Sequence, residues 1–226
     1  MKNVFFSVVL ICISTIVVGQ IHEIGILAGG TNYVGDVGKT YYVFPNKPGA
    51  GVIYKWNMNP RIALRGTYSY LPIGANDLQS DNIVRKNRAY NFSNTIHELA
   101  VGMEINFFEY DLSSDNQTAT PYILLELAAF NYQRVLSQTV TGQFLYTDKT
   151  SYAIPFGIGY KSKLVGKFAF AIEAKARYTF VDDLDYTTKD FAALNFGGTG
   201  NDWYFFTGVS LVYTFGRPAC YVNPKF

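Results

Sequence analysis

The sequence is poor in the residues that build catalytic and metal sites. Its 226 residues include two cysteines and two histidines. So few ligands argue against a structural metal site. Neither His22 nor His97 forms a serine–histidine–acid pattern with its neighbours in the sequence. We therefore expect a protein that is not an enzyme and that carries no catalytic residue, cofactor or metal.

An excess of charge of one sign is also missing. Nineteen Lys and Arg stand against 17 Asp and Glu. Without a basic excess there is no electrostatic reason to expect a nucleic-acid partner. After residue 19 the chain also lacks an apolar run of the ~20 residues that a membrane-spanning helix needs.

The first nineteen residues have the features of an export signal. Lys2 is followed by an apolar stretch over residues 4–18, and Val17-Val18-Gly19 is a weak small-residue cleavage site. We expect cleavage after Gly19, which would remove Cys12 and leave Cys220 as a single thiol. A membrane anchor is the rival interpretation, but the stretch is short for one. An interpretation of Cys12 as a lipoprotein cysteine is weaker still, because the apolar stretch continues past it.

What the chain does have is alternation of apolar and small or polar residues. Between residues 203 and 215 every second residue is apolar or aromatic, apart from Thr207. A period of two over this length indicates a β-strand that is longer than the 5–6 residues common in soluble domains. A tilted membrane-spanning strand needs about 9–11 residues. The aromatic content of 17% suits the outward apolar band and aromatic girdles of a membrane barrel.

The same alternation recurs along the chain and predicts eight strands. They are expected over residues 22–32, 48–57, 61–71, 92–107, 121–131, 152–164, 168–178 and 203–215. An even number of strands can close without leaving an unpaired edge in lipid. The predicted fold is all-β, an eight-stranded antiparallel up-and-down transmembrane β-barrel of OmpA or OmpX size. It would span residues 20–215, with a periplasmic C-terminal tail over 216–226.

The predicted connections alternate in length, as in outer-membrane barrels. Residues 58–60 and 162–167 form short turns, whereas 33–47, 72–91, 132–151 and 179–201 are long and polar. With the N-terminus in the periplasm, all four long segments lie outside the cell. The connection 108–120 breaks the rule, because it is long but periplasmic.

A soluble β-sandwich or lipocalin-like barrel would show the same period of two. On the face of the strands that carries the charged residues, these charges stand among Gly, Ala and Ser, which favours a crowded lumen over a solvated exterior.

Alternation also predicts which charged side chains point into the lumen. The expected set is Lys55, Arg65, Glu98, Glu104, Glu126, Lys161, Glu173, Lys175 and Arg177. An eight-stranded barrel is just wide enough for side chains to fill it, so these charges should pair with one another. A path for protons or ions is the functional alternative.

Several short runs in this order resemble the PorG-like outer-membrane barrels of the type IX secretion system in Bacteroidota. The runs are Glu23-Ile24-Gly25, Asn32-Tyr33-Val34-Gly35-Asp36, Ile53-Tyr54-Lys55-Trp56-Asn57, Gly102-Met103-Glu104, Phe107-Phe108 and Thr120-Pro121-Tyr122, with Asp77, Ser80-Asp81, Arg85, Arg88, Phe92 and Asn94 in the second outer loop and the strand after it. The resemblance covers nearly the whole mature chain. It implies an outer-membrane, non-enzymatic subunit, in contact with outer-membrane lipid and with the periplasmic ring of the PorK-like lipoprotein and the PorN-like protein. It also implies a role in protein secretion and gliding motility.

Topology, rather than the family, suggests where such a ring would bind. The expected contacts lie in the long periplasmic connection and the tail: Glu109, Asp111, Asp115, Arg217 and Cys220. Cys220 is either a free thiol or half of an intermolecular disulfide, which the periplasm permits.

Two other functions stay open. One is a stand-alone surface barrel that binds a ligand or surface through loops such as residues 179–201. The other is a lipid enzyme using His97, which should lie on the apolar face.

Overall fold

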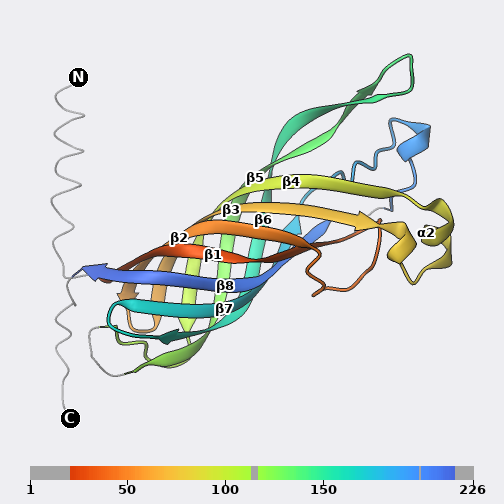
Figure 1. Cartoon of the computed structure of the whole chain (residues 1–226). Coiled ribbons are helices and arrows are strands. Elements are labelled where there is room, and N and C mark those ends of the chain that lie inside the picture. Colours follow the sequence, from red (N-terminus) through yellow and green to blue (C-terminus); the bar gives the residue numbers. More distant parts are fainter. Residues whose placement is uncertain (1–20, 113–116, 199, 217–226) are drawn as a thin grey trace, which may run out of the picture.

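The structure, a computed structural model, describes residues 21–112, 117–198 and 200–216. Figure 1 shows these residues as one ring of tilted strands with a hairpin projecting from one end. The predicted signal peptide over residues 1–19 and nearly all of the predicted tail lie outside the described residues.

Eight antiparallel strands form a closed barrel in sequence order, which confirms the predicted fold class. The strands are β1 (Ile21–Val34), β2 (Lys47–Asn59), β3 (Ile62–Asn76), β4 (Asn91–Asn106), β5 (Ala119–Gln138), β6 (Phe144–Lys163), β7 (Phe168–Thr179) and β8 (Trp203–Gly216). The ring closes where β1 pairs with β8, from Ile21 opposite Gly216 to Val34 opposite Trp203. The strands are 12 to 20 residues long, more than the ~9–11 that cross a bilayer.

Alternation along each strand separates an apolar outside from a charged inside. On β4, Leu99 and Val101 are exposed outward, whereas Glu98 and Glu104 are fully buried in the lumen. Aromatic side chains lie toward both ends of the outer wall over β6, β7 and β8. Tyr152, Tyr178 and Trp203 lie toward one end, and Tyr160, Phe168, Tyr213 and Phe215 toward the other. An apolar wall with two aromatic girdles is the surface that a bilayer requires.

The two ends of the barrel differ. At the turn end, residues 60–61, 107–118 and 164–167 connect the strands, and Ile21 and Gly216 lie there. At the loop end, the connections are residues 35–46, 77–90, 139–143 and 180–202. These loops contain the short helices η1 (Asp77–Gln79), α2 (Ile83–Arg88) and η2 (Ala192–Leu194). No helix in the described ranges is long and apolar enough to cross a membrane.

One predicted loop is mostly strand. Residues 132–151 are expected to be a long polar loop, but β5 continues to Gln138 and β6 begins at Phe144. The two strands pair up to Gln138 opposite Phe144 and project beyond the barrel as a hairpin (Figure 1). The prediction was wrong because neither face of this hairpin meets lipid. Its side chains therefore lack the apolar alternation by which the other strands are recognised.

Candidate functional site

Charged side chains fill the lumen of the barrel. Ten of them, five acidic and five basic, are at most 2% exposed: Glu23, Lys55, Arg65, Glu98, Glu104, Glu126, Lys161, Glu173, Lys175 and Arg177. The structure brings together all nine side chains that alternation predicts. The tenth, Glu23, is missing from the prediction, although the outward Ile24 and Ile26 beside it indicate by alternation that Glu23 points inward. With Glu23 included, acids and bases in the lumen balance.

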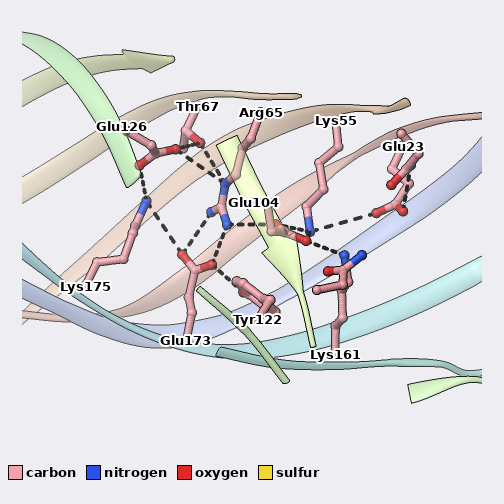
Figure 2. Close-up of polar contacts among 12 residues, drawn as sticks. Glu23, Lys55, Arg65, Thr67, Glu104, Tyr122, Glu126, Lys161, Glu173 and Lys175 are labelled. Atoms are coloured by element: carbon pink, nitrogen blue, oxygen red, sulfur yellow. Dashed lines mark hydrogen bonds and ion pairs between the residues drawn. The ribbon is translucent and has the colours of Figure 1, made fainter. Parts of the chain in front are cut away.

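Arg65 on β3 is the centre of this network (Figure 2). Its guanidinium binds Glu173 on β7 through two hydrogen bonds, Nη1 to Oε2 at 2.8 Å and Nη2 to Oε1 at 3.0 Å. Its Nη1 lies 3.6 Å from Oε2 of Glu104, and its Nε lies 3.6 Å from Oε1 of Glu126. One arginine therefore connects carboxylates on β4, β5 and β7 across the bore, and the paired geometry is the strong form of this interaction.

Toward the turn end, Glu104 is held between two lysines. Lys55 Nζ lies 3.0 Å from Glu104 Oε2, and Lys161 Nζ donates to Glu104 Oε1. Lys55 also lies 3.9 Å from Glu23. Tyr110, from the connection between β4 and β5, closes this end with its ring centre 4.5 Å from Lys161 Nζ. The long turn therefore serves as a plug of the lumen as well as a connection.

Toward the loop end, one ion pair is followed by a layer of apolar side chains. Arg177 binds Glu98 through Nη2 at 3.1 Å and Nε at 3.2 Å, and the Tyr204 hydroxyl donates to Glu98 at 2.7 Å. Around and beyond this pair the lumen is packed by buried apolar and aromatic residues: Leu71, Ile73, Ile96, Phe130, Tyr132 and Phe206. The bore is filled from end to end, as expected for eight strands, so the described residues form a packed core and no channel.

A group of carboxyls lies at the loop end, outside the strands. Asp185 accepts a hydrogen bond from the Tyr33 hydroxyl at 2.8 Å, and Asp202 lies within hydrogen-bond reach of the same oxygen. A hydroxyl has one hydrogen, so a protonated carboxyl must supply the second bond. Burial and the charge of Asp185 raise the pKa of Asp202 to about 8. Burial and the nearby Asp36 raise the pKa of Asp182 to about 6.

This group makes the loop end sensitive to pH. The pKa of Asp202 lies above its usual value of 3.8, so its contribution to stability is present at low pH and is lost as pH rises toward 8. Amide hydrogen exchange at residues 182–187, corrected for the intrinsic rate, should accelerate between about pH 5 and about pH 9. Asp202→Asn should flatten this dependence, and the exposed Asp190→Asn should leave it unchanged. An unaltered pH dependence in Asp202→Asn would assign it to another group.

The predicted partner contacts are only partly within the described residues. Glu109 is exposed at the turn end and lies 3.6 Å from Arg61, a weak surface ion pair. Asp111 is half-buried on the same connection. The other three predicted contacts lie outside the described residues: Asp115, Arg217 and Cys220.

The histidines lie on the outer wall. His97 is exposed there, and its Nδ1 lies 2.9 Å from the Tyr68 hydroxyl. His22 lies near the turn end, where its ring stacks on Tyr54 and Phe215. Both hydrogen-bond partners are tyrosine hydroxyls, an arrangement that suits an aromatic girdle at a membrane interface.

A closed ring of eight strands with an apolar wall and a salt-bridged core defines a small transmembrane β-barrel. The family model described as domain of unknown function (DUF6089) matches residues 2–224. The chain belongs to that family. No curated protein matches it.

Solved structures of small outer-membrane barrels are similar to this chain. Ail, the attachment invasion locus protein of Yersinia pestis, crystallised with the heparin analogue sucrose octasulfate, has a TM-score of 0.48 and 14% identity over 87% of this chain and 99% of that one. A major outer membrane protein from Thermus thermophilus has a TM-score of 0.47 and 11% identity over 86% and 99%. The N-terminal β-barrel domain of Pseudomonas aeruginosa OprF has a TM-score of 0.46 and 11% identity over 87% and 98%. With identities this low and TM-scores below 0.5, nothing that these proteins bind is carried over to this chain.

Proposed function

We propose that this protein is a non-enzymatic outer-membrane barrel that anchors the periplasmic ring of the type IX secretion and gliding machinery. The observation that carries the proposal is the filled lumen. Because ten paired charges and an apolar layer occupy the bore, the barrel has no room to pass a protein cargo. Its function must then lie on its ends and its wall. The resemblance to PorG-like barrels supplies the identity of the partner.

The turn end is the side on which we place that partner. Ile21 and Gly216 both lie there, so an exported chain that inserts from the periplasm leaves its turn end in the periplasm. The exposed Glu109 and the half-buried Asp111 belong to this side. Arg217 and Cys220 follow directly after β8 in the sequence. We propose that they meet the PorK-like lipoprotein or the PorN-like protein, with a disulfide through Cys220 as the strongest form of contact.

Truncation after Gly216 tests this assignment. The shortened barrel should fold and insert, because every described strand is retained. Co-purification of ring proteins should fall by roughly tenfold or more, since a contact of ~1.4 kcal/mol is worth that factor. Secretion of cargo with the C-terminal signal should fall with it. The matched control shortens the hairpin tip around residues 139–143 at the opposite end. Full recovery of ring proteins by the truncated barrel would place the contact elsewhere.

One observation favours the second candidate, a stand-alone surface barrel. The hairpin of β5 and β6 projects beyond the barrel and exposes Leu136, Val140 and Leu145. Exposed apolar side chains on a projecting hairpin are suited to contact with another surface. If the hairpin control abolishes function while the tail truncation does not, this candidate replaces the first.

A further inference from the structure

A groove follows β7 on the lipid-facing wall. Ala174 and Ala176 point outward there, and larger residues stand on both neighbouring strands. Phe156 and Phe205 flank Ala176 in register. Because adjacent strands lie ~4.8 Å apart, the two rings stand about 10 Å apart with one methyl group between them. Tyr178 and Ile172 are the next outward positions along β7, toward the loop end and the turn end respectively.

The groove is large enough to hold part of a small molecule. Its volume is about 530 Å³, within the usual range of ligand pockets. The lining is almost entirely apolar and includes Ile123, Leu125 and Ile158 on one side and Val43 on the other. Val43 belongs to the loop between β1 and β2, so a loop-end segment folds down over the outer wall to form one side of the groove.

Hydrogen bonds hold this loop segment against the wall. Outward-pointing Asn32 donates through Nδ2 to the carbonyl oxygen of Tyr41 at 3.0 Å. The Tyr42 ring contacts Phe205 with their centres 5.7 Å apart. Phe205 is consequently only 8% exposed although it faces outward. The groove is therefore a built feature of the wall and does not depend on loose side chains.

At its loop end the groove continues into a second, more polar cavity. This cavity of about 560 Å³ shares Phe156, Ala176 and Phe205 with the groove and adds Asp36 and Asn201. Asp36 is the one charged side chain among the described residues that line it. Its Oδ2 accepts a hydrogen bond from the Gly198 amide at 2.6 Å, which fixes the carboxylate at the rim. The apolar groove matches the acyl chain of a lipid, and the carboxylate at its loop end matches a cationic group in the headgroup.

We propose that the groove binds one acyl chain of a membrane lipid whose headgroup carries an ammonium, and phosphatidylethanolamine is the probe for this chemistry. The groove is part of the apolar wall that faces the bilayer, so lipid is the partner that reaches the groove. The carboxylate of Asp36 complements an ammonium and repels a purely anionic headgroup. The lipid fills the space over Ala174 and Ala176, and the rings of Phe156 and Phe205 flank it at Ala176.

Native mass spectrometry tests the proposal with barrels reconstituted in vesicles of equal phosphatidylethanolamine and phosphatidylglycerol. After extraction and delipidation in mild detergent, the wild-type barrel should retain one phosphatidylethanolamine molecule. Ala174→Leu/Ala176→Leu should lose it, because the leucine side chains fill the groove. Asp36→Asn should retain a lipid but no longer prefer phosphatidylethanolamine. The matched control, Ala28→Leu, lies on the outer wall of β1 and should behave as the wild type.

A second readout uses Trp203, which packs on Phe205 beside the groove. In a Trp56→Phe background, phosphatidylethanolamine brominated on its acyl chains should quench Trp203, and quenching should decay slowly after dilution into unbrominated vesicles. Ala176→Leu alone should make that decay fast. The proposal would be overturned if the wild type and Ala174→Leu/Ala176→Leu retained the same amount of lipid. It would also be overturned if the quenching of Trp203 decayed fast in both the wild type and Ala176→Leu. A dimer that disappears on filling would assign the groove to a second copy of the chain instead.

Discussion

Arg65→Met should destabilise the barrel by about 3–5 kcal/mol, the usual cost of removing one partner from a buried ion pair. The substitution leaves Glu173 without its two hydrogen bonds and leaves Glu104 and Glu126 with one cation fewer. Urea unfolding in phospholipid vesicles, followed by tryptophan fluorescence, measures the loss directly. The free energy of unfolding should fall while the unfolding slope stays that of an intact barrel.

Two further variants keep this result interpretable. Arg61→Met removes an arginine of the exposed pair with Glu109 and should cost no more than about 1 kcal/mol. Arg65→Met/Glu173→Met removes both members of the central pair and should recover part of the loss, because no uncompensated carboxylate remains opposite residue 65. Equal effects of Arg61→Met and Arg65→Met would contradict a lumen held by buried charge.

Leu127→Arg should cost about 2–4 kcal/mol if the outer wall faces lipid near the bilayer midplane. Leu127 is 72% exposed and pairs with the outward Val101, near the middle of the wall. In water an exposed Leu→Arg change is close to neutral, so the large cost arises only from a charge in hydrocarbon. The same vesicle unfolding experiment gives the value.

The matched control for this variant is Val140→Arg, at the tip of the hairpin. Val140 is fully exposed outside the apolar band, and its substitution should change stability by no more than about 0.5 kcal/mol. A neutral Leu127→Arg would mean that the wall faces water. That result would replace the transmembrane barrel with a soluble one.

The barrel could be predicted from the sequence because each wall strand has one lipid face and one lumen face. The two environments impose opposite residue types at a period of two, which fixes strand positions and the inward set from Lys55 to Arg177. The hairpin of β5 and β6 escaped prediction because both its faces are outside lipid. Glu23 is missing from that set although the outward Ile24 and Ile26 beside it place it inward by the same alternation.

Features that depend on distant residues could not be predicted. Tyr33 meets Asp185 and Asp202 across 152 and 169 residues of sequence, and strand parity gives no information on where loop carboxyls fold. The groove on β7 likewise needs Val43 from another loop, and two alanines in a strand carry no signal by themselves. Alternation along a strand determines which face of the barrel wall a side chain is on, whereas the packing of the loops determines which residues cover that face.

The most direct test of the anchor proposal is a pull-down of the tagged protein from native outer membranes in mild detergent. Run with and without reductant and analysed by mass spectrometry, it should recover the periplasmic ring proteins. A band that disappears with reductant would place Cys220 in the contact. Recovery of the barrel alone, from membranes in which the secretion machine is intact, would contradict the anchor and favour a stand-alone surface barrel.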